Sequence, residues 1–147
     1  MRAKVRRFLE DVTRTGVYRI DAKDDPAEVI EAAAALGWAA FRVDGGDVPD
    51  KAAFLSRSAV AMRFPAYFGQ NWDAFEEIVN DPDAMPQARG YLLLLDDFAA
   101  FARSQPGDWA TARSILADAA ARWGAEGRGF LVLLRKAARA APDAEWV

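Results

Sequence analysis

Two stretches of the chain are apolar at every position over the length of a β-strand. Residues Tyr91–Leu95 and Phe130–Leu134 contain only tyrosine, phenylalanine, leucine and valine. A strand with one face in water would carry polar side chains at every second position, so this lack of alternation indicates strands buried on both faces. Two further segments are predicted to be strands, a short one at Val17–Ile20 and another at Trp38–Val43.

The segments between these strands have the period and the end signals of helices. Each begins at a proline or after a side chain that can cap a helix, and each stops close to a glycine or proline. The predicted helices are Ala27–Leu36 between Pro26 and Gly37, Lys51–Met62 after Asp50, Trp72–Asn80 after Asn71, and Trp109–Trp123 after Asp108.

The order of these elements predicts the fold class. Strands that alternate with helices indicate an α/β domain with a mainly parallel sheet covered on both faces. The length of 147 residues is typical of one domain, which we expect to span residues 1–147. The longest apolar runs fall far short of the roughly 18 residues of a membrane span, so we expect no membrane association. Residues 137–147 give no clear structural prediction.

Composition removes several kinds of chemistry. The chain has no cysteine and no histidine, which excludes disulfides, thiolate catalysis, cysteine metal sites and every histidine-dependent catalytic arrangement. We therefore expect no enzyme activity, no metal and no cofactor. The formal net charge of −3 also argues against nucleic-acid binding, which needs clustered lysine and arginine.

The basic N-terminus does not have the pattern of a secretion signal. Four basic residues precede Phe8, but Glu10 and Asp11 interrupt the apolar core that such a signal requires. We therefore expect a cytoplasmic protein. The basic residues are interpreted as a solvated helix end, because opposite charges follow them at once and no aromatic side chains lie among them.

The sharpest charge asymmetry lies between Arg63 and Arg89. No lysine or arginine occurs between these two residues. At about 100° per residue, one face of the helix predicted there is polar and the opposite face is apolar. The carboxylates of the segment are Asp73, Glu76, Glu77, Asp81 and Asp83, and the polar helix face consists of Asp73, Glu76, Glu77 and Asn80.

This acidic face has two interpretations. Charged helix faces are the rule on soluble proteins, so it can be an ordinary solvated surface. Alternatively, with Tyr67 and Asn71 beside it, the face docks into a cationic site and occupies the positions that phosphates take in an enzyme that binds RNA. In that case it would also steer association, with rates that fall as salt rises.

A second pair of carboxylates, Asp96 and Asp97, follows the apolar run at 91–95. Active sites of α/β proteins often lie at this end of a strand, and paired carboxylates can hold Mg²⁺. A remote alternative function is therefore a carboxylate-dependent hydrolase. Because no second group of ligands lies nearby in the sequence, a turn or capping role is favoured.

The segment that enters the acidic helix resembles a known family. Residues Phe64–Phe75 are similar to the barstar signature of a proline, paired aromatics, glycine, asparagine and aspartate entering a helix. Val43–Gly45 resembles the turn after that family's first strand, and Leu93–Asp96 and Phe130–Leu134 resemble its other two strands. The resemblance extends from residue 38 to residue 136.

This resemblance implies a barstar-like three-stranded parallel sheet with helices packed on it, within residues 37–136. Residues 1–36 are then an N-terminal extension expected to add a strand and a helix, and residues 137–147 are a C-terminal tail. The resemblance also implies an inhibitor, monomeric when free, that binds a basic barnase-like extracellular ribonuclease while that enzyme is still inside the cell that makes it.

The resemblance also implies a partner-binding surface. Tyr67, Asn71 and Asp73 match residues on the inhibitory loop and helix of barstar. Glu77 falls where barstar has the aspartate that enters the ribonuclease's phosphate site, and Glu76 replaces a tryptophan. A further acidic contact is expected from the penultimate helix, and residues 81–89 are an insertion. The full predicted surface is Tyr67, Asn71, Asp73, Glu76, Glu77, Asn80 and Asp118.

The departures at Glu76 and Glu77 leave open an alternative within the same class of binding proteins. The chain would then be an immunity protein or antitoxin for a different toxin.

Overall fold

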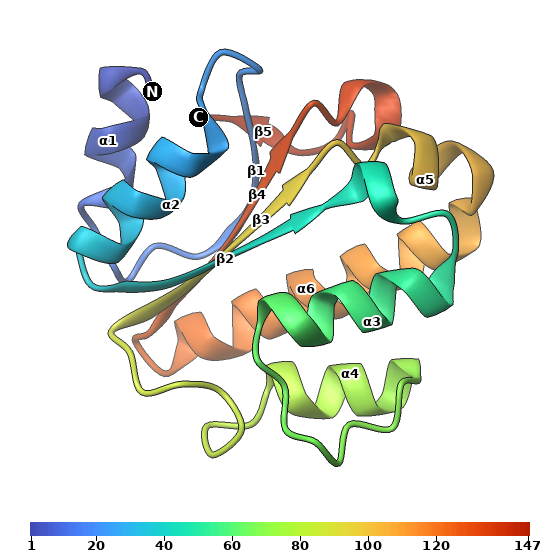
Figure 1. Cartoon of the computed structure of the whole chain (residues 1–147). Helices are drawn as coiled ribbons and strands as arrows, with labels where there is room; N and C mark the ends of the chain where they lie inside the picture. The colour runs from blue at the N-terminus through green and yellow to red at the C-terminus, as the bar shows by residue number, and fades with distance from the viewer.

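The part of the chain that the structure describes forms one five-stranded parallel sheet. The computed structural model covers residues 1–147, apart from the side chain of Ala138. The strand order is β2-β3-β4-β1-β5, with every neighbouring pair parallel (Figure 1). The α/β class and the mainly parallel sheet are confirmed. The strands are β1 (Gly16–Ile20), β2 (Trp38–Asp44), β3 (Gly90–Asp96), β4 (Gly129–Arg135) and β5 (Glu145–Trp146).

Helices cover both faces of this sheet. The helices α1 and α2 lie on one face, and α3, α5 and α6 lie on the other, with α4 outside α3 and α6 (Figure 1). The bounds are α1 (Ala3–Leu9), α2 (Pro26–Ala35), α3 (Lys51–Ala61), α4 (Trp72–Val79), α5 (Ala99–Ser104) and α6 (Pro106–Ala125), with short 3₁₀ turns η1 (Gly45–Asp47) and η2 (Ala138–Ala140).

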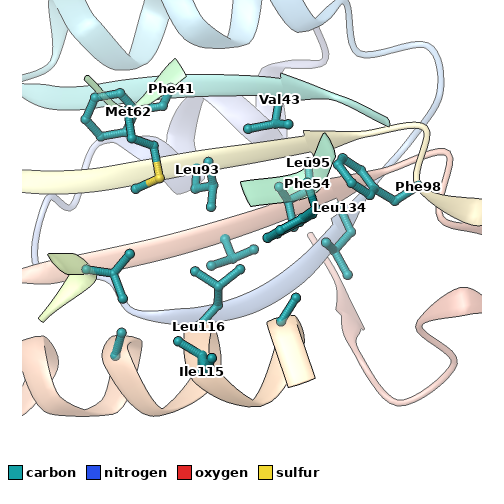
Figure 2. Close-up of a cluster of buried hydrophobic side chains, with 14 of the residues drawn as sticks. Phe41, Val43, Phe54, Met62, Leu93, Leu95, Phe98, Ile115, Leu116 and Leu134 are labelled. Atoms are coloured by element: carbon teal, nitrogen blue, oxygen red, sulfur yellow. The ribbon is translucent and has the colours of Figure 1, made fainter. Parts of the chain in front are cut away.

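The central strands are buried on both faces, as their apolar runs predict. Every residue of β3 is buried, and so is nearly all of β4. Along β3, Leu93 and Leu95 belong to a hydrophobic cluster with α3, α5 and α6, while Leu92 and Leu94 belong to a second cluster with α1 and α2. Figure 2 shows part of the first cluster, in which Phe54 from α3 lies close to Leu95 and Phe98.

The N-terminal extension covers the second face. β1 lies beside β4, with Gly16–Ile20 in register with Leu131–Arg135. Val5 and Leu9 of α1 and Val29 of α2 pack with the leucines of β3 and β4. The extension therefore supplies the expected strand and helix, and in addition α1.

Two glycines allow the N-terminal segment to cross the start of the central strands. Gly90 and Gly129 begin β3 and β4 and lie opposite each other. A Cβ atom at Gly90 would lie 2.6 Å from the carbonyl oxygen of Val12, and one at Gly129 would lie 2.6 Å from that of Arg14. No side chain fits at such distances, so only glycine allows this close approach of two backbones.

The expected three-stranded sheet is wrong, because the described residues form five strands. The three expected strands are β2, β3 and β4, and the sheet continues beyond β4 through β1 and β5. β5 comes from the C-terminal tail, where Glu145 and Trp146 pair with Tyr18 and Arg19. A two-residue strand has no periodicity to detect, so the sequence pattern could not predict it.

Two helix predictions are also corrected. α6 begins at Pro106 with Gln105 as its N-cap residue, rather than at Trp109 after Asp108. Proline suits the first helical position because its missing N–H is not needed there, and Asp108 lies in the first turn, where the helix dipole favours its charge. The helix α5 was not predicted, because it has only 6 residues and no side-chain cap.

Arg135 ties together three elements at the carboxyl end of the sheet. Its Nη1 donates to Asp96 Oδ1 at 2.9 Å, its Nε donates to the carbonyl oxygen of Asp24 at 2.8 Å, and its Nη2 donates to that of Ala22 at 2.6 Å. Arg42 Nη2 donates to Asp96 Oδ2 at 2.8 Å. Both oxygens of the buried Asp96 carboxylate are therefore engaged, and the loop before α2 is fixed to β4.

Asp24 is a second buried carboxylate, and its side chain has no exposed surface. It accepts hydrogen bonds from the backbone N, the Nε and the Nη2 of Arg2 at 2.8, 2.9 and 2.7 Å. Burial raises the pKa of Asp24, but the hydrogen bonds and the charge of Arg2 outweigh burial and hold the pKa below its usual value. This ion pair locks the N-terminus onto the loop before α2.

We expect removal of residues 1–36 to abolish folding. Without α1, β1 and α2, the inner leucines Leu92, Leu94, Leu131 and Leu133 would face water, and each fully buried leucine contributes about 1.5–3 kcal/mol by its burial. A fragment of residues 37–147 should show no cooperative urea transition by circular dichroism, whereas the full chain should. A cooperative transition in the fragment would show that the extension is dispensable.

We expect Arg2→Met to change how stability depends on pH. Because the pKa of Asp24 is lowered in the folded chain, its ion pair stabilises the native state above the unfolded pKa of about 3.9 and is lost as pH falls through the folded pKa. In the variant, burial without Arg2 would raise the pKa of Asp24. The difference in free energy of unfolding between the two proteins should therefore be largest near pH 7 and should narrow in acid.

Urea titrations from pH 7 to pH 3 would measure this difference. Arg6→Met is the matched control, because Arg6 is an exposed arginine of α1, the helix that follows Arg2, and makes no salt bridge among the described residues. A loss of stability in Arg2→Met that is the same at every pH would contradict the assignment.

Candidate functional site

The acidic helix α4 forms where its cap and its apolar side predict. Asn71 Oδ1 accepts a hydrogen bond from the backbone N of Ala74 at 2.8 Å, which confirms the predicted N-cap. Phe75, Ile78 and Val79 are buried against the core. The opposite side therefore faces outward, as the spacing of the carboxylates predicts.

The outward face of α4 borders a surface hollow. Asp73, Glu76 and Glu77 are exposed, and none of them forms a salt bridge with a described residue. The hollow has a volume of ≈ 540 Å³. Its lining, which we call the acidic hollow, consists of Asp73, Glu76, Glu77, Asn80, Asp81, Pro82 and Arg122.

Four of the predicted surface residues thus meet at one place, and Arg122 joins them from α6. Arg122 lies 42 positions beyond Asn80 and was not among the residues predicted for this surface. Its only signal in the sequence is its place one helical turn after Asp118 on the same face of the helix. Asp118 itself is exposed on α6 but does not line the acidic hollow.

Two indole groups hold α4 against α6. Trp123 Nε1 of α6 donates to the carbonyl oxygen of Val79 at 2.8 Å, at the last residue of α4. Trp72 Nε1, at the first residue of α4, donates to Asp108 Oδ1 at 3.4 Å. The carbonyl groups of the last helical turn lack partners within their own helix, so the Trp123 bond satisfies a group that would otherwise be buried without one. Both ends of α4 are therefore fixed.

The loop before α4 presents Tyr67 to solvent. Phe64 and Phe68 anchor the loop with their rings 5.0 Å apart, packed against the core. Tyr67, which lies between these two residues in the sequence, is 73% exposed. Arg63 and Gln70 bound the loop with φ values of 55° and 48°, a region that residues other than glycine adopt at a cost.

The two asparagines of the predicted surface have structural partners of their own. Asn71 caps α4 through Oδ1 and donates through Nδ2 to the carbonyl oxygen of Gly69 at 3.2 Å. Asn80 Nδ2 donates to the carbonyl oxygen of Glu76 at 2.8 Å, while its Oδ1 is buried without a hydrogen-bond partner. Asn71 therefore shapes the loop and the helix start, in addition to any contact it makes with a partner.

The carboxylates at the end of β3, Asp96 and Asp97, do not have the geometry of a metal site. Arg42 and Arg135 engage both oxygens of Asp96, and Asp97 is exposed with a φ of 65°. Among the residues that the structure describes, no three carboxylate-type ligands gather where they could hold a metal ion. Asp96 has instead the role of joining β2, β3 and β4.

No helix in the described chain has the length and apolar character needed to span a membrane.

Comparison with solved structures shows a shared fold. A search of solved structures finds the ORC2 protein of Aeropyrum pernix in its ADPNP-ADP complexes, with a TM-score of 0.62 and 19% sequence identity over 93% of this chain. The present chain spans 40% of the length of that ORC2 chain. At this identity the likeness concerns the arrangement of strands and helices alone.

Comparison of sequences gives the family. No curated protein matches the chain in sequence. The family model described as Barstar (barnase inhibitor) matches residues 38–135, which run from the first residue of β2 to the last residue of β4 and include α4 with its loop. Because this match covers about two thirds of the chain and contains the acidic hollow, the chain belongs to the Barstar (barnase inhibitor) family.

Proposed function

We propose that this protein is an inhibitor that blocks the active site of a basic ribonuclease with the acidic hollow and the loop that carries Tyr67. The observation that carries the proposal is the set of exposed carboxylates on α4, which have no counter-ion bonds within the described chain. Membership of an inhibitor family supports a binding role over a catalytic one. We place this action in the cytoplasm of the producing cell.

The charges of this surface suit a site that binds RNA. Carboxylates on a rigid helix can take the positions of phosphate groups and pair with the arginine and lysine side chains that bind them. Asp73, Glu76 and Glu77 project from successive turns of α4, and Asp81 follows at its end. The same charges attract a basic partner before contact, and salt weakens that attraction.

The rigidity of α4 also favours tight binding. Association costs less when the binding groups are already held in place. Trp72 and Trp123 fix the two ends of α4, and Phe75 packs on Phe54 with ring centres 5.7 Å apart. We infer that the carboxylates of the acidic hollow are presented in one arrangement before the partner arrives.

A different cationic toxin is the second candidate partner. Glu76 and Glu77 depart from the barstar pattern, and Arg122 adds a positive charge to the surface. These features change the shape and the charge of the contact surface. The alternative function is therefore an immunity protein or antitoxin for a toxin that is not a ribonuclease.

Nucleotide binding is disfavoured in this chain. A phosphate group at the start of the helix after β1 would need free backbone N–H groups and no competing negative charge. Here Asp25 caps α2 by accepting a hydrogen bond from the backbone N of Ala27 at 3.1 Å. Asp21 and Asp24 lie in the same loop. Asp25 therefore already uses one of the N–H groups that a phosphate would need, and the negative charges of Asp21 and Asp25 would repel an anion at this point.

We expect stoichiometric inhibition when the purified protein is titrated into a barnase-type ribonuclease assay. The double variant Asp73→Lys/Glu77→Lys should bind about 100-fold more weakly or worse, because each lost charge-assisted hydrogen bond contributes on the order of 1.5–3 kcal/mol. Raising the salt concentration should weaken the wild type more than the variant.

Glu10→Lys/Glu31→Lys is the matched control for that titration. It changes the net charge by the same amount at exposed carboxylates near α1 and α2, on the other face of the sheet. Equal inhibition by the wild type and the Asp73/Glu77 variant would show that the acidic hollow is not the binding surface.

We expect Trp123→Phe to loosen the end of α4 while keeping its charges. The substitution leaves the buried carbonyl group of Val79 without its donor, which should lower the free energy of unfolding by about 1–3 kcal/mol. Stopped-flow binding should show an unchanged association rate and a faster dissociation rate. Trp146→Phe, at an exposed indole, should change neither the free energy of unfolding nor the dissociation rate. If Trp123→Phe also left both unchanged, the role of this tether would be refuted.

A further inference from the structure

The acidic hollow contains one positive charge, on Arg122. Its walls are carboxylates on the α4 side and Arg122 on the α6 side. Along α6, Asp118 precedes Arg122 by one turn and Glu126, the C-cap residue, follows it by one turn. A guanidinium group in such surroundings has several possible counter-ions within its own chain.

Arg122 nevertheless makes no ion pair with any carboxylate that the structure describes. Its side chain also donates no hydrogen bond to a described residue, in contrast to Arg2, Arg42, Arg113 and Arg135. Its field can weaken the repulsion between the carboxylates of the acidic hollow, but none of them holds it in a close ion pair. The group is exposed and available at a surface that a partner would cover.

We propose that Arg122 is a specificity-determining residue of this surface and that it pairs with a carboxylate of the partner. This inference rests on the proposed inhibitory function and deepens it. The partner is then a protein whose cationic site has an acidic side chain beside it, rather than a site of uniform positive charge.

The reason is the cost of covering a guanidinium group. A charge that loses water on docking must gain a partner, or the complex is weakened. Arginine donates five hydrogen bonds in a fixed planar fork, which a carboxylate matches with two parallel bonds. A partner that offers only arginine and lysine would repel Arg122 and leave these donors unsatisfied, so Arg122 selects against such a partner.

The test asks whether removing the charge of Arg122 strengthens or weakens binding to the partner. For a uniformly cationic partner, removing a positive charge from this surface would strengthen binding. The proposal predicts the opposite: Arg122→Ala should dissociate about tenfold faster, because it breaks a covered charge pair, and Arg122→Glu faster still. The dissociation rate of Arg122→Lys should lie between the rate of the wild type and that of Arg122→Ala, because lysine retains the charge but not the paired geometry.

Association and dissociation rates would be measured by surface plasmon resonance with the full chain against a panel of basic barnase-type ribonucleases. Arg103→Ala is the charge-matched control, since Arg103 lies on α5 at a different hollow and makes no described salt bridge. For the ribonuclease that binds, each acidic residue near its active site would be changed to its amide. One of these changes should show a coupling to Arg122→Ala in a double-mutant cycle.

The outcomes separate the two proposals. Faster dissociation of Arg122→Ala together with one coupled carboxylate supports the inference. Tighter or unchanged binding of Arg122→Ala overturns the inference and leaves the inhibitory function standing. Failure of the wild type to bind every ribonuclease of the panel overturns the proposed function, and the inference with it.

Discussion

The two central strands, β3 and β4, are apolar on both faces, and the rest of the architecture depends on this constraint. A sheet of this kind is stable only when helices exclude water from both sides. Helices α3, α5 and α6 cover one side, and α1 and α2 cover the other. The N-terminal extension is therefore part of the same core as the residues that the family model matches. Gly90 and Gly129 admit its backbone at the start of the central strands.

Buried charge joins these parts at the opposite end of the sheet. Arg135 connects β4 with Asp96 of β3 and with the loop before α2, and Arg2 engages Asp24 in that loop. Breaking such a pair leaves an uncompensated charge in the interior, which is more costly than the loss of a surface salt bridge. Asp24 and Asp96 therefore have structural roles, which distinguishes them from the carboxylates of α4.

The acidic hollow lies outside this framework and is supported by it. α4 packs on α3 through Phe75 and is fixed to α6 at its two ends through Trp72 and Trp123. Its carboxylates remain in water without counter-ions from the described chain, which costs little while they are solvated. A rigid helix with unsatisfied charge is suited to binding a surface of the opposite sign. Arg122 gives this surface a mixed character that a partner must match.

The sequence alone determined the features that depend on neighbouring residues. The apolar runs defined β3 and β4, the Asn71 cap and the helical period defined α4, and the carboxylate spacing placed Asp73, Glu76, Glu77 and Asn80 on one face. Local preferences and hydrogen bonds between adjacent turns are enough to fix these.

Only the tertiary structure decided which distant segments meet. It placed β1 beside β4, added β5 to β1, and brought Arg122 into the acidic hollow while leaving Asp118 outside its lining. It also showed that Asp96 is bound by Arg42 and Arg135. These contacts follow from how whole elements pack to bury both faces of the sheet, and no spacing along the chain encodes that packing.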